Sequence, residues 1–367
     1  MQIGIVGGGP IGLIAARAFS DKGHNVRLFD PSIEKPKMSL ALAESTLQLL
    51  TQIGVELEAG QDLTEILVNE HGLPGSVLLD SVECGYPRFG RVVCSQVLEN
   101  AVSPLVSTSV ESVSVSAIRA RSQSSNPCIE LETGEIVRPD LVVLADGGRS
   151  HLTESLGLSP QFRSFNRSAL LGRVQVSTPW VGRAYERFVG TGPLAVLPIE
   201  ESIYGFVWSL DPSDAESLYQ NPEKLTAALK AAMPRELGDV EMIVEPILIP
   251  LVERWIDQPF RPGVALIGNG AQTIHPVAGQ GLNLALRGVA QLINELQHHE
   301  TDQAVRVAFA NWKPNRDRTR LASSSLEAIF DRDLLPRKVL TSVGMTLADQ
   351  SPWLKKKIAE AGMGIVS

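Results

Sequence analysis

Near the start of the chain, closely spaced glycines follow a short apolar run and precede a helical pattern. This segment contains Gly7, Gly9, Pro10, Ile11 and Gly12. The G-x-G-x-x-G spacing lets a pyrophosphate approach the backbone and directs it at the N-terminus of a helix, whose free N–H groups favour an anion. Asp30 stands 18 positions after Gly12, where a carboxylate suits the hydroxyls of an adenosine ribose. The spacing predicts a dinucleotide site but does not distinguish FAD from NAD.

A second glycine-rich segment runs from Gly268 to Leu292. Within it, Gly279-Gln280-Gly281 opens a helical pattern with its apolar positions on one face. The positive end of this helix favours a nearby anion, and reduced flavin is negative along the N1 and O2 edge of its ring. Asn269 offers an amide to a ribityl hydroxyl. This segment therefore favours FAD over NAD.

A third turn, from Ala145 to Ser150, contains Asp146 and two glycines. It directly follows Leu141 to Ala145, a continuous apolar run typical of a central parallel strand. Taken alone, the turn fits a dinucleotide contact and an ordinary polar turn equally well.

The elements that must position these turns follow from apolar periodicity. We predict strands over 2–6, 25–29, 110–118, 141–145 and 264–267, helices over 11–22, 40–50, 95–102 and 279–297, and a hairpin from 128 through Thr133-Gly134. A final helical region is expected from about 302, with breaks near Pro336 and Pro352.

The predicted fold class is α/β: a discontinuous Rossmann-like FAD-binding domain, an inserted and mainly antiparallel β-sheet domain for the substrate, and C-terminal helices. We expect the first part of the FAD-binding domain over 1–160, with the stretch near 62–90 contributing to the substrate domain. The β-rich substrate domain is expected over 161–258, completion of the FAD-binding domain over 259–300, and C-terminal helices over 301–367.

Composition excludes several other classes of protein. A formal net charge of −8 argues against nucleic acid as the main partner. Three cysteines without a C-x-x-C pair argue against a disulfide framework and a structural metal site, and we predict no metal. The sequence contains no run of about 18 consecutive apolar residues, so we predict no membrane span. Because the first strand leads directly into the glycine turn, we expect no cleaved signal peptide and a cytoplasmic protein, free or at the inner face of the membrane.

Together, the three turns, in this order and at these separations, resemble the class A flavoprotein aromatic hydroxylases. The similarity covers nearly the whole chain and is greatest to the ubiquinone-biosynthesis branch, in particular to its 2-polyprenyl-6-methoxyphenol hydroxylases. Most of that branch has Asp-Ala-Ala-His where this chain has Asn269-Gly270-Ala271-Gln272, and the form in this chain resembles that of the 2-polyprenyl-6-methoxyphenol hydroxylases. The stretches 182–198 and 315–318 also resemble it.

The resemblance implies an FAD monooxygenase. NADPH or NADH would reduce FAD, and oxygen would form a flavin C4a-hydroperoxide that hydroxylates the ring of a polyprenyl-methoxyphenol. The resemblance also implies roles for several residues. The glycine turn and Asp30 would hold the ADP half of FAD, and Asn269 the ribityl or pyrophosphate. Asp146 would serve the dinucleotide. The isoalloxazine would be surrounded by Gly279, Gln280, Gly281, Leu282 and Asn283.

Two further positions concern the reaction itself. Pro276 is expected to line the flavin face near the reacting carbon. His275 is either a general base or a histidine that shapes the loop, because a phenol's own acidity can suffice.

The chain departs from the branch where cations are usual. Met38 and Gln96 stand in place of two arginines, and Gly288 in place of an aspartate. Because neither Met nor Gln offers the bidentate fork of Arg, we expect FAD to be held less tightly.

Two alternative functions stay open. One is an FAD monooxygenase that acts on another phenol or lipid, and the other is a catalytically weak flavin-binding subunit of a biosynthetic complex. Lys355 to Lys357 beside Trp353 fit either a peripheral membrane contact or a charged helix face. The resemblance also implies association with other ubiquinone-biosynthesis enzymes.

Overall fold

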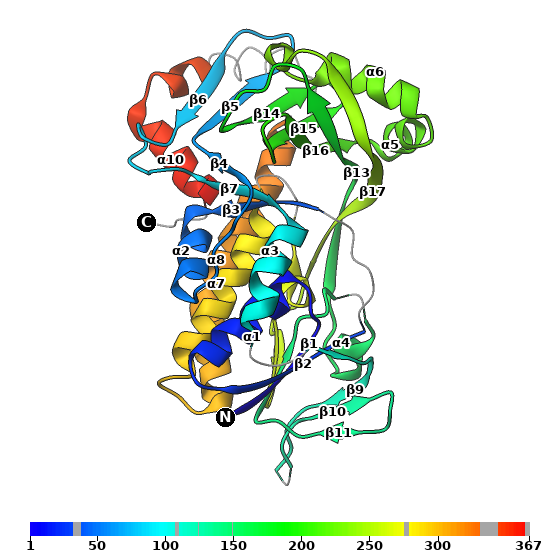
Figure 1. Ribbon diagram of the computed structural model, residues 1–367, viewed down its shortest axis with the longest axis vertical. Coiled ribbons are helices and arrows are strands. Elements are labelled where there is room, and N and C mark those ends of the chain that lie inside the picture. Colours follow the sequence, from blue (N-terminus) through cyan, green and yellow to red (C-terminus); the bar gives the residue numbers. More distant parts are fainter. Residues whose placement is uncertain are drawn as a thin grey trace.

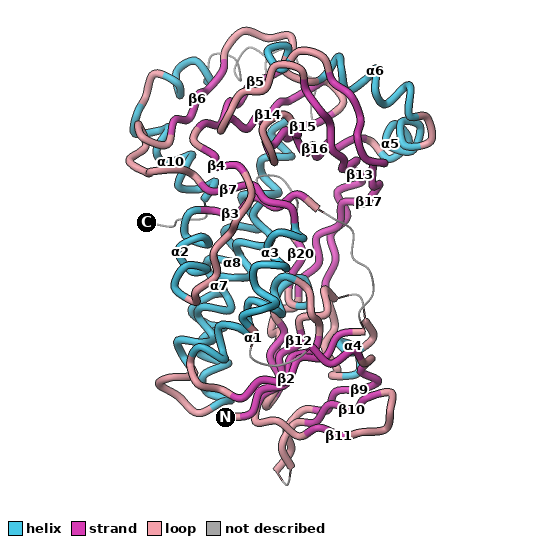
Figure 2. The backbone as a smooth tube through the Cα atoms, viewed as in Figure 1, coloured by secondary structure: helices cyan, strands magenta, loops and turns pink. Residues whose placement is uncertain are grey.

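Two β-sheets, one mainly parallel and one mainly antiparallel, lie at opposite ends of the molecule, with helices packed beside and between them (Figure 1). This computed structural model describes residues 1–31, 38–106, 110–123, 125–148, 150–274, 279–330 and 344–363, and only the backbone for 322–330. Two long strands extend from the antiparallel sheet toward the parallel one (Figure 2).

The first sheet has six strands in the order β18-β19-β12-β1-β2-β8. The strands are β1 (Gln2–Val6), β2 (Asn25–Asp30), β8 (Val110–Ser112), β12 (Leu141–Leu144), β18 (Phe260–Arg261) and β19 (Val264–Leu266). All neighbouring pairs are parallel except β18 with β19. The central strand β12 is completely buried, because its alternate residues join hydrophobic clusters on the two opposite faces.

Helices cover one face of this sheet. They are α1 (Pro10–Asp21), α2 (Glu44–Gln52), α3 (Ser95–Val102), α7 (Gln280–Glu295) and α8 (Thr301–Phe330). Their apolar residues form one core with Ile3, Ile5 and Val143 of the sheet. On the other face lie α4 (Leu152–Ser155) and a small sheet of β9 (Val115–Arg119), β10 (Cys128–Leu131) and β11 (Ile136–Val137).

The second sheet has eight strands in the order β20-β17-β13-β16-β15-β14-β5-β6. They are β5 (Glu65–Glu70), β6 (Ser76–Asp80), β13 (Gln161–Val176), β14 (Arg183–Val189), β15 (Gly192–Pro198), β16 (Ile203–Leu210), β17 (Val240–Trp255) and β20 (Gln272–Thr273). Only the β14–β5 pair is parallel. Helices α5 (Pro212–Tyr219) and α6 (Pro222–Ala232) share a dry core with one face of this sheet.

A three-stranded sheet lies between the two large ones. It consists of β3 (Ser39–Ala43), β4 (Gln61–Leu63) and β7 (Gly90–Cys94). Single turns of 3-10 helix occur at η1 (Ser103–Leu105), η2 (Arg235–Leu237) and η3 (Gly268–Gly270), and α10 (Pro352–Met363) packs near β6.

Two predicted elements differ from the structure. The helix predicted over 40–50 is wrong in its first part, because Leu40 to Ala43 pair with β7 as a strand and the helix begins only at Glu44. The strand predicted over 110–118 is divided into β8 and β9, which belong to different sheets. In both cases pairing with distant segments overrides the local pattern.

The predicted fold class is confirmed: a mainly parallel sheet of discontinuous sequence, a mainly antiparallel sheet and C-terminal helices. Strands β5 and β6, from the 62–90 stretch, belong to the antiparallel sheet. The division into domains at the stated residues stays a prediction. α10 begins at Pro352, whereas Pro336 lies outside the described residues.

Candidate FAD site

The first glycine turn is closed at two positions and open at the third. Gly7 has a φ of +108°, and a Cβ there would lie 2.4 Å from the Ala145 carbonyl oxygen. A Cβ on Gly12 would lie 1.9 Å from the Gly7 carbonyl oxygen. A Cβ on Gly9, by contrast, would meet no atom within 4 Å. The turn is therefore tight inside and leaves space at Gly9 for a group to approach the backbone.

Asp30 lies against this turn at the end of β2. Its side chain is buried, and its Oδ2 accepts a hydrogen bond of 2.5 Å from the Gly8 N–H. Helix α1 begins at Pro10, and no side chain caps its N-terminus at Gly9. Its first N–H groups thus offer donors to an anion, and a carboxylate stands beside them for ribose hydroxyls.

The second and third turns contact each other and the first. Asp146 closes its own turn by accepting hydrogen bonds from the Gly148 N–H, at 2.9 Å, and from the Ser150 hydroxyl. A Cβ on Gly148 would lie 2.8 Å from the Asn269 carbonyl oxygen. A Cβ on Gly268 would lie 3.4 Å from Ile11 of the first turn. Segments 7–12, 145–148 and 268–270 therefore form one junction.

Arg254, at the end of β17, joins these turns and was missed in the sequence. Its Nη1 donates to the carbonyl oxygens of Asn269, at 3.1 Å, and Gly270, at 2.7 Å. Burial lowers the pKa of Arg254, and the negative charge of Asp146 opposes that shift. Nothing in the sequence marks this cation, because its partners are backbone atoms of a distant loop. The Asn269 side chain is exposed beside it.

At the start of α7, the predicted flavin residues have different surroundings. Gly279 is left-handed, with a φ of +59°, and a Cβ there would lie 3.1 Å from Ala41 Cβ. The Gln280 amide donates to the Gly362 carbonyl oxygen of α10. Gly281 and Leu282 are half-buried, and Leu282 packs on the core of the first sheet.

Asn283 uses its side chain inside the protein. Its Oδ1 accepts from the Ala43 N–H at 2.9 Å and the Thr46 hydroxyl at 2.8 Å, and its Nδ2 donates to the carbonyl oxygens of Ala41 and Gly279. This side chain therefore fixes β3 against α7, and its predicted contact with the isoalloxazine would have to come from its backbone. His275 and Pro276 lie outside the described residues.

The two positions without the usual arginines are neighbours in space. The Met38 carbonyl oxygen accepts from the Ser95 N–H at 2.8 Å, at the start of α3. Gln96 is exposed on the first turn of that helix and donates to Asn100 at 2.9 Å. Arg173 of β13 reaches the same corner and donates to Cys94 Sγ at 3.0 Å. The sequence therefore brings one cation to this corner from a different strand.

At Gly288, where an aspartate is usual in the branch, the space for a side chain is filled by a tryptophan of another helix. A Cβ on Gly288 would lie 3.1 Å from the ring of Trp312 in α8. The neighbouring Arg287 donates to Asn315 Oδ1 at 3.1 Å, and burial lowers its pKa to about 10. Ring packing between α7 and α8 thus takes the place of the carboxylate.

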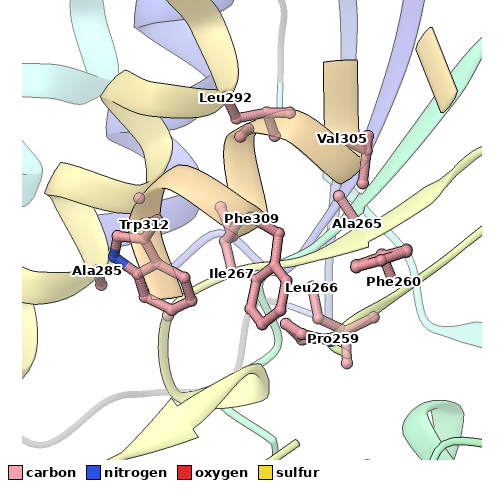
Figure 3. Close-up of a pocket in the computed structure, with 13 residues that line it drawn as sticks. Pro259, Phe260, Ala265, Leu266, Ile267, Ala285, Leu292, Val305, Phe309 and Trp312 are labelled. Atoms are coloured by element: carbon pink, nitrogen blue, oxygen red, sulfur yellow. The ribbon is translucent and has the colours of Figure 1, made fainter. Parts of the chain in front are cut away.

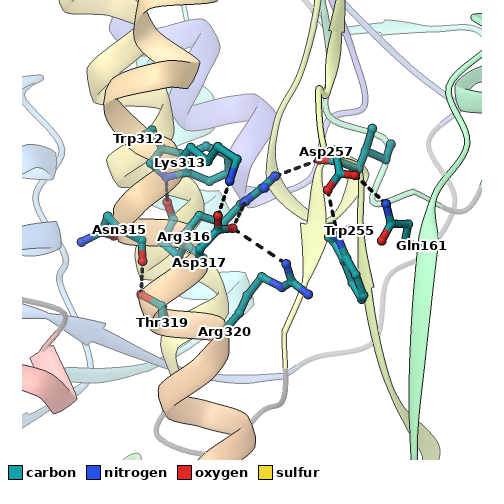
Figure 4. Close-up of polar contacts among 12 residues, drawn as sticks. Gln161, Trp255, Asp257, Trp312, Lys313, Asn315, Arg316, Asp317, Thr319 and Arg320 are labelled. Atoms are coloured by element: carbon teal, nitrogen blue, oxygen red, sulfur yellow. Dashed lines mark hydrogen bonds and ion pairs between the residues drawn. The ribbon is translucent and has the colours of Figure 1, made fainter.

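The arginines of the 315–320 stretch tie α8 to the end of β17 (Figure 4). Arg316 is completely buried and donates to the Ile256 carbonyl oxygen at 2.8 Å. Arg320 bonds Glu253 at 2.7 Å and stacks on Trp255, with its guanidinium carbon 3.7 Å from the ring centre. These contacts hold the two halves of the molecule together.

A pocket of about 40 Å³ lies between α7, α8 and β19, lined by apolar side chains such as Phe309 and Trp312 (Figure 3). It has room for about one water molecule and no polar side chain that would orient a ligand. We therefore regard it as a packing defect and not as the reaction site.

Solved structures of other proteins have the same fold as this chain. The p-nitrophenol 4-monooxygenase PnpA of Pseudomonas putida superposes with a TM-score of 0.81 at 16% identity, covering 100% of this chain and 98% of that one. HpxO of Klebsiella pneumoniae, solved with FAD and uric acid, gives a TM-score of 0.78 at 15% identity, covering 99% and 97%. These similarities show that the chain shares its fold with both proteins.

The chain belongs to the FAD binding domain family, which matches residues 1–322. Among curated relatives, the 3-demethoxyubiquinol 3-hydroxylase of Escherichia coli is 26% identical and covers 99% of this chain and 98% of its own length. The ubiquinone hydroxylase UbiL of Rhodospirillum rubrum is 27% identical over 98% of this chain and 89% of its own. The cofactor is FAD, and the protein is a flavoprotein monooxygenase.

Proposed function

We propose that this protein hydroxylates the ring of a polyprenyl-methoxyphenol in ubiquinone biosynthesis, using FAD, NADPH or NADH, and O₂. The contact of segments 7–12, 145–148 and 268–270 at one junction carries the proposal, because it offers a dinucleotide a tight turn, a helix N-terminus and a buried carboxylate together. The names of two curated relatives, the 3-demethoxyubiquinol 3-hydroxylase and the ubiquinone hydroxylase UbiL, support the substrate class.

The chain's own residues would divide the work along the cofactor. The open side of Gly9 and the start of α1 would receive the pyrophosphate, and Asp30 the adenosine ribose. Asn269 would bond the ribityl or pyrophosphate. Residues 279–283 would face the isoalloxazine, where the positive end of α7 stabilises negative charge at the ring edge. Bound FAD would supply electron transfer from the nicotinamide and activation of oxygen.

Stopped-flow spectroscopy tests this proposal. The FAD-loaded protein is mixed with NADPH or NADH, with and without 2-geranyl-6-methoxyphenol as a short-chain substrate, and products are identified by mass spectrometry. We expect the phenol to accelerate flavin reduction and to gain one oxygen atom. Reduction that only another phenol or lipid accelerates would favour the first alternative function.

The second alternative, a weakly catalytic flavin-binding subunit, is motivated by Met38 and Gln96 in place of cations. It predicts no reduction with either nicotinamide. Quinone analysis of a deletion strain separates the readings further, since accumulated 2-polyprenyl-6-methoxyphenol supports the hydroxylase and unchanged ubiquinone in a strain without a paralogue contradicts it.

A membrane contact is a further part of the proposal, because a polyprenyl chain resides in lipid. Among the described residues, no helix combines the length and apolarity that crossing a bilayer requires. On α10, Trp353 is 69% exposed and Lys356 is exposed beside it, whereas Lys355 bonds Asp349 at 3.0 Å. Flotation with anionic vesicles should therefore weaken in Trp353→Ala and be unaffected by Lys355→Gln. Equal flotation of wild type and Trp353→Ala would contradict a contact through α10.

A further inference from the structure

The eight-stranded sheet has two faces, and β14 contributes side chains to both. Ala184 and Phe188 join a cluster with β3 on the face turned toward the FAD-binding half. Tyr185 and Arg187 alternate with them and point to the opposite face. Tyr185 packs there with α5 and α6, and we call this the outer face. Arg187 is thus a cation on the side of the sheet turned away from the candidate FAD site.

The strand register places Arg187 at the end of a row of polar residues. Arg187 pairs with Asn69 of β5, and Asn69 pairs with Ser76 of β6. Directly opposed residues of neighbouring strands share a face, so the three side chains lie next to one another on the outer face, about 5 Å apart. On its other side Arg187 pairs with the buried Leu194 of β15, where the apolar core begins. We call Ser76, Asn69 and Arg187 the polar row.

Arg187 is a buried cation that the described part of the chain leaves without a counter-ion in contact. The residue is only 9% exposed, and its side chain makes no hydrogen bond or ion pair with any described residue. Its Nε is completely buried. Burial lowers the pKa of this guanidinium, yet an arginine side chain stays protonated in proteins. Because an unpaired buried charge is costly, proteins ordinarily pair it or place it where a ligand completes it.

The neighbour of Arg187 in the polar row also has an incomplete set of hydrogen bonds. The Oδ1 of Asn69 is buried and accepts no hydrogen bond from any described residue. Ser76 is half-buried on β6, beside this amide. The row therefore combines a cationic donor, an amide and a hydroxyl, and the protein completes neither the Arg187 donor nor the Asn69 acceptor.

Charged groups of the turn η2 lie close enough to act on Arg187 without touching it. The Glu236 carboxylate raises the pKa of Arg187, and the Arg235 guanidinium lowers it. Both residues are exposed, and neither forms an ion pair with Arg187. Arg183, at the start of β14, is already paired with Glu65 at 2.6 Å. With two arginines against one carboxylate, the local charge beside the polar row is positive, which favours an anion.

We propose that the polar row is a binding site for a phosphate ion on the outer face of the sheet. The planar guanidinium of Arg187 would donate to two phosphate oxygens, and the Ser76 hydroxyl to a third. The Asn69 Oδ1 would accept from the P–O–H group that a phosphate ion keeps at neutral pH. A carboxylate would leave this acceptor incomplete, because it carries no proton at that pH. Binding forms no covalent bond, and the site is separate from the proposed hydroxylation.

Isothermal titration of the FAD-loaded protein with inorganic phosphate at pH 7 tests the proposal. Sulfate and acetate are titrated at the same ionic strength, because both accept hydrogen bonds but neither carries a proton at this pH. We expect wild type to bind phosphate more tightly than either of them. Arg187→Met should weaken phosphate binding about 10- to 100-fold, since it removes charge-assisted hydrogen bonds. Arg163→Met is the matched control, because Arg163 is an exposed arginine of β13.

A second variant leaves the polar row intact. Glu236→Gln removes the nearby carboxylate and should tighten phosphate binding several-fold at low salt, with a smaller gain at high salt. Equal phosphate affinity in wild type and Arg187→Met, or an unchanged affinity in Glu236→Gln, would overturn the proposal. So would thermal stabilisation by phosphate and sulfate to the same extent in every protein, because that is a general effect of salts on folding. None of these results depends on flavin reduction or on hydroxylation of a phenol.

Discussion

Gly9 and Gly12 lie in the same turn, yet the structure predicts opposite consequences for adding one methyl group to each. The Gly9 backbone is extended, with φ −72° and ψ 177°, and its Cβ position is open. The Gly12 position is closed, because its Cβ would lie 1.9 Å from the Gly7 carbonyl oxygen. The pair therefore separates the folding of the turn from its use in binding.

The expected magnitudes follow from these surroundings. Gly9→Ala should leave the free energy of unfolding of the FAD-free protein within about 1 kcal/mol of wild type, because alanine adopts this backbone without strain. Gly12→Ala must move the backbone by about 1 Å to relieve the overlap, which costs about 1–3 kcal/mol even without FAD.

For the affinity of FAD, the expectation is the opposite: Gly9→Ala should weaken binding although it barely changes stability. In Gly9→Ala the methyl group would occupy the space through which we propose that the pyrophosphate reaches the N–H groups of α1. Losing one charge-assisted hydrogen bond costs about 1.5–3 kcal/mol, so the dissociation constant of FAD should rise about 10- to 100-fold.

Denaturant unfolding of the FAD-free proteins and fluorescence titration with FAD measure the two quantities separately. Gly190→Ala is a matched control, since a Cβ there also meets no atom within 4 Å and the residue lies in the turn between β14 and β15. If Gly9→Ala binds FAD as tightly as Gly190→Ala does, the pyrophosphate does not pass over Gly9 and the reasoning is refuted.

Three further substitutions test other parts of the argument. Burial raises the pKa of Glu186 from 4.5 to about 7, so the folded protein keeps this proton longer than the unfolded chain and loses stability as pH rises between those values. Glu186→Gln should therefore match wild type near pH 4.5 and exceed its unfolding free energy by at most about 3 kcal/mol above pH 7, and equal curves at both pH values would contradict the shift. Gly288→Asp should destabilise by about 1–3 kcal/mol in thermal unfolding, because it displaces Trp312, and should cost less in a Trp312→Ala background. Gln96→Arg should lower the dissociation constant of FAD several-fold at low salt and lose that gain at high salt, and an equal effect at both would rule out a charge contact.

The first two strands of the first sheet and the helix between them were predictable because their signals are local. An apolar run, a glycine spacing and a helical period fixed β1, α1 and β2 to within one or two residues. The strand β3 was not predictable, since Leu40 to Ala43 are held extended by β7 and by Asn283, which stands about 240 positions later.

In the candidate site, too, some residues could be predicted from the sequence and others could not. The sequence identifies Gly7, Gly9 and Gly12 by their spacing. It does not identify Arg254, because this side chain bonds only backbone oxygens and belongs to no sequence pattern. The alternation along β14 separates Tyr185 from Glu186, but only the packing of the whole sheet shows which of the two faces the FAD-binding half.

The position of that face depends on α8, which the sequence presents as an ordinary helix. Trp312 donates to the Leu284 carbonyl oxygen of α7 at 3.2 Å, and four residues later Arg316 donates to the Ile256 carbonyl oxygen just after β17. Helix α8 therefore bonds both α7, which would face the flavin, and the segment that directly follows β17 of the eight-stranded sheet. Because a ring substrate of the proposed reaction would lie between this sheet and α7, the separation of these two elements would set the geometry of the reaction. Residues that touch neither ligand thus fix the distance over which hydroxylation would take place.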